Sequence, residues 1–179
     1  MHRLMLLRHA KTERAAPGER DRDRGLTKRG RADAPAIGAY MAHHGLVPDI
    51  AVVSPARRAQ ETWTLAAGAF AKPPPAVSEE RIYNATAGAL VAVIVGAPIV
   101  SMPKANTLLL VGHNPGLQEL AVQLIASGDS EMREQLKEKL PTTGLVVIDL
   151  PIDDWSLIHP RAGRLDRFVS PRLIEASTE

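Results

Sequence analysis

Two stretches decide the fold: LMLLRH at residues 4–9 and LLLVGH at residues 108–113. Each is a short apolar run of the kind that forms a buried strand, and each ends on a histidine. A third run, IAVV at residues 50–53, is followed by Ser54-Pro55. Segments with helical character separate these runs. The sequence therefore predicts an α/β protein of three layers, with an open, mostly parallel sheet and helices on both of its faces.

The segments between the runs carry helix signals. Thr27 is a suitable N-cap for a helix that reaches His44, and Gly45 is a suitable stop. Pro35 lies inside this segment, so we expect it to kink or interrupt the helix. The other expected elements are a helix from Ser54-Pro55 to about Phe70, a weak helix over residues 87–95, a helix from about Leu117, and a closing pair of strands at residues 145–150 and 155–159.

Length and composition limit the class of protein. The chain has 179 residues, of which 45% are hydrophobic and 23% charged, so we expect a single globular domain over residues 1–179. It has no cysteine, which excludes disulfides, thiolate metal sites and a cysteine nucleophile. The apolar run at residues 4–7 is too short for a signal peptide or a membrane span, so we expect a cytoplasmic protein without a membrane partner.

The formal net charge is +2, and much of the basic excess lies between Arg3 and Arg31. A local excess of this kind favours a small anionic ligand over nucleic acid, which requires a broader basic face with stacking aromatics. Aromatic residues make up only 3% of the chain. No heptad pattern or apolar stripe stands out, so the sequence leaves the oligomeric state open.

The residues that could carry chemistry follow the three apolar runs. In an open parallel sheet the ligand crevice lies beyond the carboxyl ends of the strands, so His9 and His113 could face one cleft. Arg58, near the start of the second helix, could join free backbone N–H groups in binding an anion, for which phosphate is the natural candidate. A single histidine at a strand end is more often structural than catalytic. The prediction rests on the set of Arg8, His9, Arg58 and His113 taken together.

Four motifs occur in order along the chain: LRHAK at residues 7–11, DRGLT at 23–27 with Gly30, SPARRAQET at 54–62 and VGHNPG at 111–116. With these motifs the sequence resembles the histidine phosphatases of the phosphoglycerate-mutase-like fold, and among them the short SixA-like phosphohistidine phosphatases. The resemblance spans nearly the whole chain. It implies a hydrolase that acts on phosphoryl groups and needs no metal or other cofactor.

The resemblance also implies roles for individual residues. His9 would be the nucleophile that takes the phosphoryl group, and Arg8, Arg58 and His113 would bind its oxygens. Arg58 is preferred to Arg57 for this role, because the motif places its arginine directly before alanine, and Arg57 is the second choice. Three further residues are expected to contact the substrate: Arg24, Thr12 and Asn114. His113 could act as a cationic clamp or as a neutral donor.

Larger members of the superfamily use a carboxylic acid to protonate the leaving group, and the candidates for this role are Asp21, Asp23, Glu79 and Glu80. SixA-like members lack such an acid, which favours phosphoramidate or aryl phosphate substrates with good leaving groups. The stretch over residues 72–106 is short for a cover over the site. This indicates a shallow pocket that suits a phosphorylated side chain on another protein.

Three alternatives remain open. The first is a broad small-molecule phosphatase or a mutase of the same superfamily. The second is a metal-dependent hydrolase with His9, His113, Asp21 and Asp23 as ligands, although the neighbouring arginines would repel a cation. The third is a module that binds phosphate or phosphohistidine without turning it over.

Overall fold

A computed structural model describes residues 1–96, 102 and 104–178. Within these residues the strands form one sheet in the order β3-β2-β4-β1-β6-β7-β5. The strands are β1 (His2–Arg8), β2 (Ile50–Val53), β3 (Ala76–Ser78), β4 (Thr107–Gly112), β5 (Ile125–Gly128), β6 (Leu145–Leu150) and β7 (Gly163–Val169). Pairs β3-β2, β2-β4, β4-β1 and β7-β5 are parallel, whereas β6 runs antiparallel to both of its neighbours. The predicted mostly parallel α/β sheet is therefore confirmed.

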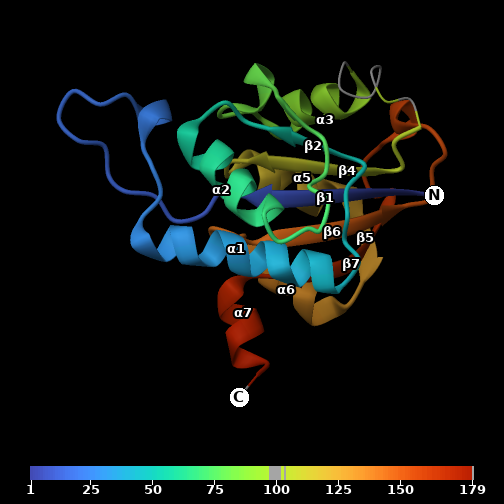
Figure 1. Cartoon of the computed structure of the whole chain (residues 1–179). Coiled ribbons are helices and arrows are strands. Elements are labelled where there is room, and N and C mark those ends of the chain that lie inside the picture. Colours follow the sequence, from blue (N-terminus) through green and yellow to red (C-terminus); the bar gives the residue numbers. More distant parts are fainter. Residues whose placement is uncertain (97–101, 103, 179) are drawn as a thin grey trace.

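Helices cover both faces of the sheet, and Figure 1 shows α3 on one side and α1 and α7 on the other. The α-helices are α1 (Lys28–His43), α2 (Arg57–Ala67), α3 (Ala87–Val95), α5 (Gly116–Leu124), α6 (Ser130–Glu138) and α7 (Pro171–Ala176), and the 3-10 helices are η1 (Asp21–Asp23), η2 (Glu80–Ile82) and η3 (Trp155–Leu157). One buried cluster joins the sheet to α3, α5 and α6, and a second joins it to α1 and α2. None of the described helices is long and apolar enough to cross a membrane.

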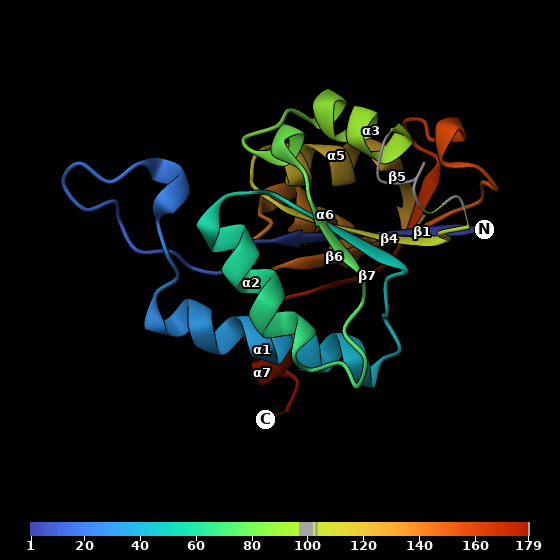
Figure 2. The ribbon, with the colours of Figure 1, turned by 45° about the horizontal axis from the view of Figure 1, so that its top comes forward.

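Strand register brings three chain segments to one edge of the sheet. Arg8, the last residue of β1, is the partner of Gly112 at the end of β4. Val53, the last residue of β2, is the partner of Val111 on the other side of β4. The three adjacent parallel strands thus end at the same level. Beyond this level the segment between β1 and α1 projects away from the body of the protein, as both ribbon views show (Figures 1 and 2).

Helix α1 confirms its predicted cap and stop. The hydroxyl of Thr27 accepts a hydrogen bond from the N–H of Gly30 at 3.0 Å, and Gly45 has the positive φ of +65° that a helix stop requires. Pro35 does not interrupt α1, which is one continuous helix, and the alternative of a kink stays a prediction. Its buried face packs against the sheet and α2. A Cβ at Gly38 would lie 2.1 Å from the carbonyl oxygen of Ala66, so glycine allows this close approach.

Two other predicted boundaries were also wrong. The second helix begins at Arg57 and ends at Ala67, not from Ser54 to about Phe70, because Ala56 has a non-helical backbone conformation. The segment 155–159 is not a strand: η3 forms there, capped by the side chain of Asp154, which accepts from the N–H of Ser156 at 2.8 Å. The strand that pairs with β6 on this side is β7, and β5 lies outside it at the edge of the sheet. The helix predicted at residues 87–95 is confirmed as α3.

Candidate active site

The site lies at the carboxyl ends of β1, β2 and β4. His9, Ser54 and His113 are the residues that directly follow these strands. The N–H of His9 donates to the carbonyl of Gly112 at 3.0 Å, and the N–H of Ser54 donates to the carbonyl of Val111 at 2.9 Å. The rings of His9 and His113 have centroids 5.3 Å apart. The structure therefore brings the two predicted histidines together.

His9 is held in one tautomer. Its Nδ1 lies 2.8 Å from the carbonyl oxygen of Ala10. A carbonyl oxygen can only accept, so Nδ1 carries the proton and the lone pair of the neutral ring is on Nε2. Burial, followed by the charges of Arg58 and Arg8, lowers the pKa of His9 from 6.5 to about 4. His9 is therefore neutral near pH 7, with a free lone pair.

His113 is also neutral in this structure. Burial is the main cause that lowers its pKa from 6.5 to about 3, and the neighbouring His9 and Arg58 add to it. Its Nε2 lies 2.7 Å from the hydroxyl of Ser54, whereas its buried Nδ1 has no hydrogen-bond partner among the described residues. The ring of Tyr83 meets it edge to face at 5.5 Å. In the absence of an anion, His113 is a neutral donor or acceptor and not a cation.

Arg58 is the buried arginine of the SPARRAQET motif at residues 54–62. Only 4% of it is exposed, whereas Arg57 is exposed and pairs with Glu61 one turn along α2. The guanidinium of Arg58 donates to the main-chain oxygen of Asp21 at 2.9 Å and to its carboxylate at 3.0 Å. Its own carbonyl accepts from the hydroxyl of Thr62 at 2.6 Å. These contacts favour Arg58 over Arg57 as the anion-binding residue.

Arg8 reaches the site from the last position of β1. Its Nη1 donates to the carbonyl of Leu140 at 2.9 Å, and its buried Nε has no partner among the described residues. Burial lowers the pKa of Arg8 from its ordinary value. The carbonyl of Leu140 also accepts from the amide of Asn114 at 3.0 Å. Asn114 and Arg8 thus share the carbonyl of Leu140 as acceptor. A direct contact of Asn114 with a substrate stays a prediction.

Arg24 and Thr12 contact each other, and the charge of Arg24 acts on His9. Arg24 donates to the hydroxyl of Thr12 at 2.7 Å and to the carboxylate of Asp21 at 2.9 Å. The charge of Arg24 is among those that lower the pKa of His9, so Arg24 contributes to the electrostatics of the site. Both residues belong to the segment between β1 and α1, and their contact with a substrate stays a prediction.

The four acid candidates all form ion pairs. Asp21 contacts Arg24 and Arg58, and hydrogen bonds from Tyr83 and Arg24 hold its pKa well below the usual range. The other pairs are Asp23 with Arg20, Glu79 with Arg81, and Glu80 with Arg22. Asp21 is the candidate in direct contact with Arg58, and its depressed pKa makes it a poor proton donor in this state.

Sequence reasoning missed two contributors. The hydroxyl of Ser54 was assigned to a helix cap and not to His113. Tyr83 was not considered, although its hydroxyl donates to Asp21 and its ring touches His113. Both contacts join residues far apart in the sequence, so no local pattern indicates them. The chain has only two tyrosines, and this was the one feature that could have drawn attention to Tyr83. Within the described residues, no group of three or more histidine, aspartate or glutamate side chains could hold a metal ion.

The chain was compared with known proteins. The family model of the histidine phosphatase superfamily (branch 1) matches residues 4–91. An uncharacterised protein of Mycobacterium tuberculosis is 34% identical over 171 residues, which are 93% of this chain and 100% of that protein. The structure of SixA from Agrobacterium tumefaciens, a proposed phosphohistidine phosphatase, is 31% identical with a TM-score of 0.76 and covers 95% of this chain and 99% of its own. The structure of a SixA from Nakamurella is 24% identical with a TM-score of 0.79 and covers 95% of this chain and 96% of its own, which supports the fold alone. The chain thus belongs to the histidine phosphatase superfamily, as a phosphatase with a SixA-like fold.

Proposed function

We propose that this phosphatase transfers the phosphoryl group of its substrate to Nε2 of His9 and then to water, without a metal ion. The preferred substrate is phosphohistidine on another protein. The single observation that carries the mechanism is the 2.8 Å contact from Nδ1 of His9 to the carbonyl of Ala10. It fixes the tautomer in which Nε2 is the nucleophilic nitrogen.

The reaction has two displacements. In the first, the lone pair of Nε2 forms a bond to phosphorus as the bond to the leaving nitrogen or oxygen breaks. In the second, water attacks phosphorus, and inorganic phosphate leaves with the neutral ring restored. Charge is spread over the phosphoryl oxygens in a loose transition state, so cationic groups and positioning supply most of the catalysis. Arg8, Arg58 and His113 are suited to these oxygens.

The choice of substrate follows from the acid candidates. All four candidate carboxylates are held in ion pairs, so none of them is well placed to protonate a poor leaving group. A substrate with a good leaving group, such as the imidazole of phosphohistidine, has the least need of one. The resemblance to the Agrobacterium SixA points in the same direction. A broad small-molecule phosphatase would share the mechanism and differ only in the relative rates.

The test is a rapid-quench experiment in excess chelator with an aryl phosphate and with a phosphohistidine protein. The protein is compared with His9→Gln and with the control His159→Gln, which changes an exposed histidine. We expect a phosphoenzyme that survives base but not acid, in the protein and the control only. The phosphohistidine protein should react faster than the aryl phosphate. Activity that is lost to chelator but kept by His9→Gln would establish a metal hydrolase, and binding without any turnover would establish a phosphate-binding module.

A further inference from the structure

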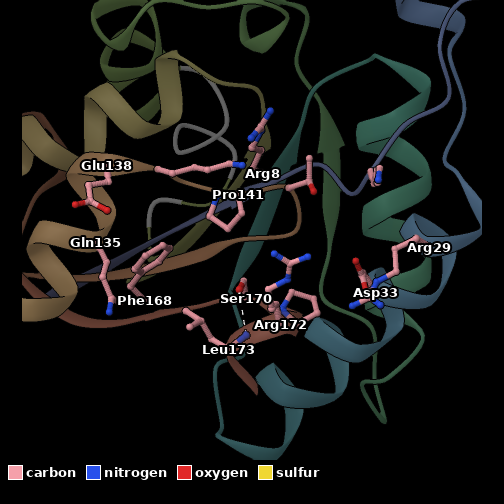
Figure 3. Close-up of a pocket in the computed structure, with 14 residues that line it drawn as sticks. Arg8, Arg29, Asp33, Gln135, Glu138, Pro141, Phe168, Ser170, Arg172 and Leu173 are labelled. Atoms are coloured by element: carbon pink, nitrogen blue, oxygen red, sulfur yellow. Dashed lines mark hydrogen bonds and ion pairs between the residues drawn. The ribbon is translucent and has the colours of Figure 1, made fainter. Parts of the chain in front are cut away.

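A groove with a volume of about 820 Å³ lies beside the phosphoryl site, and Arg8 is one of its walls (Figure 3). Residues from several elements line it: the segment after β1, the start of α1, the end of α6, the turn before β6, and the end of β7 with the start of α7. This volume is within the range of ligand-binding pockets. The groove is therefore large enough to hold a part of the substrate beyond its phosphoryl group.

The groove is basic. Its lining contains five basic residues, Arg8, Lys11, Arg29, Lys139 and Arg172, against the two acidic residues Asp33 and Glu138. Arg29 is neutralised by Asp33 at 2.9 Å and by Glu175 at 3.3 Å. For the other four, no carboxylate among the described residues lies within ion-pair distance. The positive charge is therefore concentrated in the groove, since the whole chain has a net charge of only +2.

The groove also has an apolar wall. Pro141, Phe168, Pro171 and Leu173 line it, and the side chain of Leu173 is 39% exposed, which is high for a large apolar residue. Figure 3 shows Arg172 between Leu173 and Arg8, so basic and apolar groups face the same space. A small dianion would use the charges and leave the apolar wall uncovered. A polypeptide that carries carboxylates and an apolar side chain would contact both.

We propose that this groove docks an acidic segment, with an apolar side chain, of the phosphorylated protein. Arg8 connects the two regions, because it lies at the end of β1 beside His9 and also lines the groove. This inference rests on the proposed function, because the docked segment belongs to the same protein whose phosphohistidine reacts at His9. Exposed basic residues steer an acidic partner to the surface and select it against a neutral one.

Direct binding tests the docking independently of turnover. Two fluorescent peptides of equal length without phosphate are titrated against the protein: one has Glu and Asp around a leucine, and the other has Gln and Asn at those positions. The acidic peptide should bind about tenfold more tightly, as expected for two or three exposed ion pairs, and this preference should weaken in high salt. In Lys139→Gln/Arg172→Gln the ratio should fall towards one. The exposed Arg164, at the other end of β7, provides the control Arg164→Gln, which should keep the ratio.

The same peptides bearing phosphohistidine then show whether docking serves the reaction. The ratio of kcat/KM for the acidic and neutral peptides should exceed one in the protein and collapse in the double variant. Equal affinity for the two peptides, or a preference that survives Lys139→Gln/Arg172→Gln, overturns the docking proposal. Failure to hydrolyse an aryl phosphate would overturn the proposed function and leave the binding result to decide on the groove. A third outcome would overturn a polypeptide as the occupant: the two peptides bind equally, and the double variant loses affinity for a small bisphosphate.

Discussion

The carboxylate of Asp21 accepts a hydrogen bond from Nη2 of Arg58 at 3.0 Å. The same guanidinium is also held by the main-chain oxygen of Asp21 at 2.9 Å. The hydroxyl of Tyr83 donates to the same carboxylate oxygen, and Arg24 donates to the other oxygen. Asp21 thus accepts from both Nη groups of Arg58, for which a phosphoryl oxygen would have to compete.

Asp21→Asn should therefore tighten the binding of inorganic phosphate. The substitution removes the competing negative charge, while the main-chain contact still positions Arg58. Because the Asp21 side chain is about half exposed, the gain should be modest, about 1 kcal/mol or fivefold in the inhibition constant of phosphate. Asp23→Asn, in the same 3-10 turn but paired with Arg20, is the matched control. Weaker phosphate binding by Asp21→Asn alone would mean that Asp21 positions Arg58 and does not compete with the ligand.

Arg58→Gln should lower kcat/KM for an aryl phosphate by at least about a hundredfold, whereas Arg57→Gln should change it less than about threefold. The difference follows from burial, because Arg58 directs a desolvated cation at the site and Arg57 pairs with Glu61 in solvent. Steady-state kinetics of the two variants decide the matter, with circular dichroism to verify folding. Equal losses would mean that both arginines of the motif bind the substrate.

Ser54→Ala should lower kcat by about tenfold, because Nε2 of His113 loses its partner at 2.7 Å and the ring loses its orientation. A buried nitrogen left without a partner should also cost about 1–3 kcal/mol of unfolding free energy. Ser54→Thr keeps the hydroxyl and should restore most of the activity. If Ser54→Thr were as slow as Ser54→Ala, packing around Ser54 and not its hydroxyl would be the important property.

Much of the fold could be predicted because its signals are local. Apolar runs gave β1, β2, β4 and β6, and Thr27 and Gly45 gave the limits of α1. The interruption expected at Pro35 did not occur, because packing of the helix face outweighs the loss of one hydrogen bond. Strand β7 was missed because it carries an extra residue, Asp166, opposite Val147 and Ile148 of β6, which interrupts the alternation of its side chains.

The candidate site was predicted in part for a similar reason. His9, His113 and Arg58 follow strand ends or begin a helix, so topology alone brings them together. The partners that set their state come from distant segments: Ser54 is 59 residues from His113, and Asp21 is 37 residues from Arg58. No local pattern reports such contacts. The basic groove was missed because its residues come from both ends of the chain and only the folded protein joins them.

The two buried histidines should make the protein less stable in acid. In the folded state burial lowers the pKa of His9 to about 4 and that of His113 to about 3, from an ordinary value of 6.5. Between about pH 4 and 6.5 the unfolded state therefore binds more protons than the folded state. Stability must rise with pH in this window, and it is lost as the pH falls.

His9→Gln should flatten this dependence, because one of the two groups no longer takes up a proton on unfolding. Each such proton contributes up to about 1.4 kcal/mol per pH unit to the slope, so the unfolding free energies of the protein and His9→Gln should diverge between pH 6.5 and 4. Urea unfolding at half-unit intervals measures the two curves, and carboxylates such as Asp21 affect both curves alike. His159→Gln removes an exposed histidine and should follow the unmodified protein. Parallel curves for the protein and His9→Gln would mean that His9 takes up a proton as easily in the folded state as in the unfolded chain, and that burial does not lower its pKa.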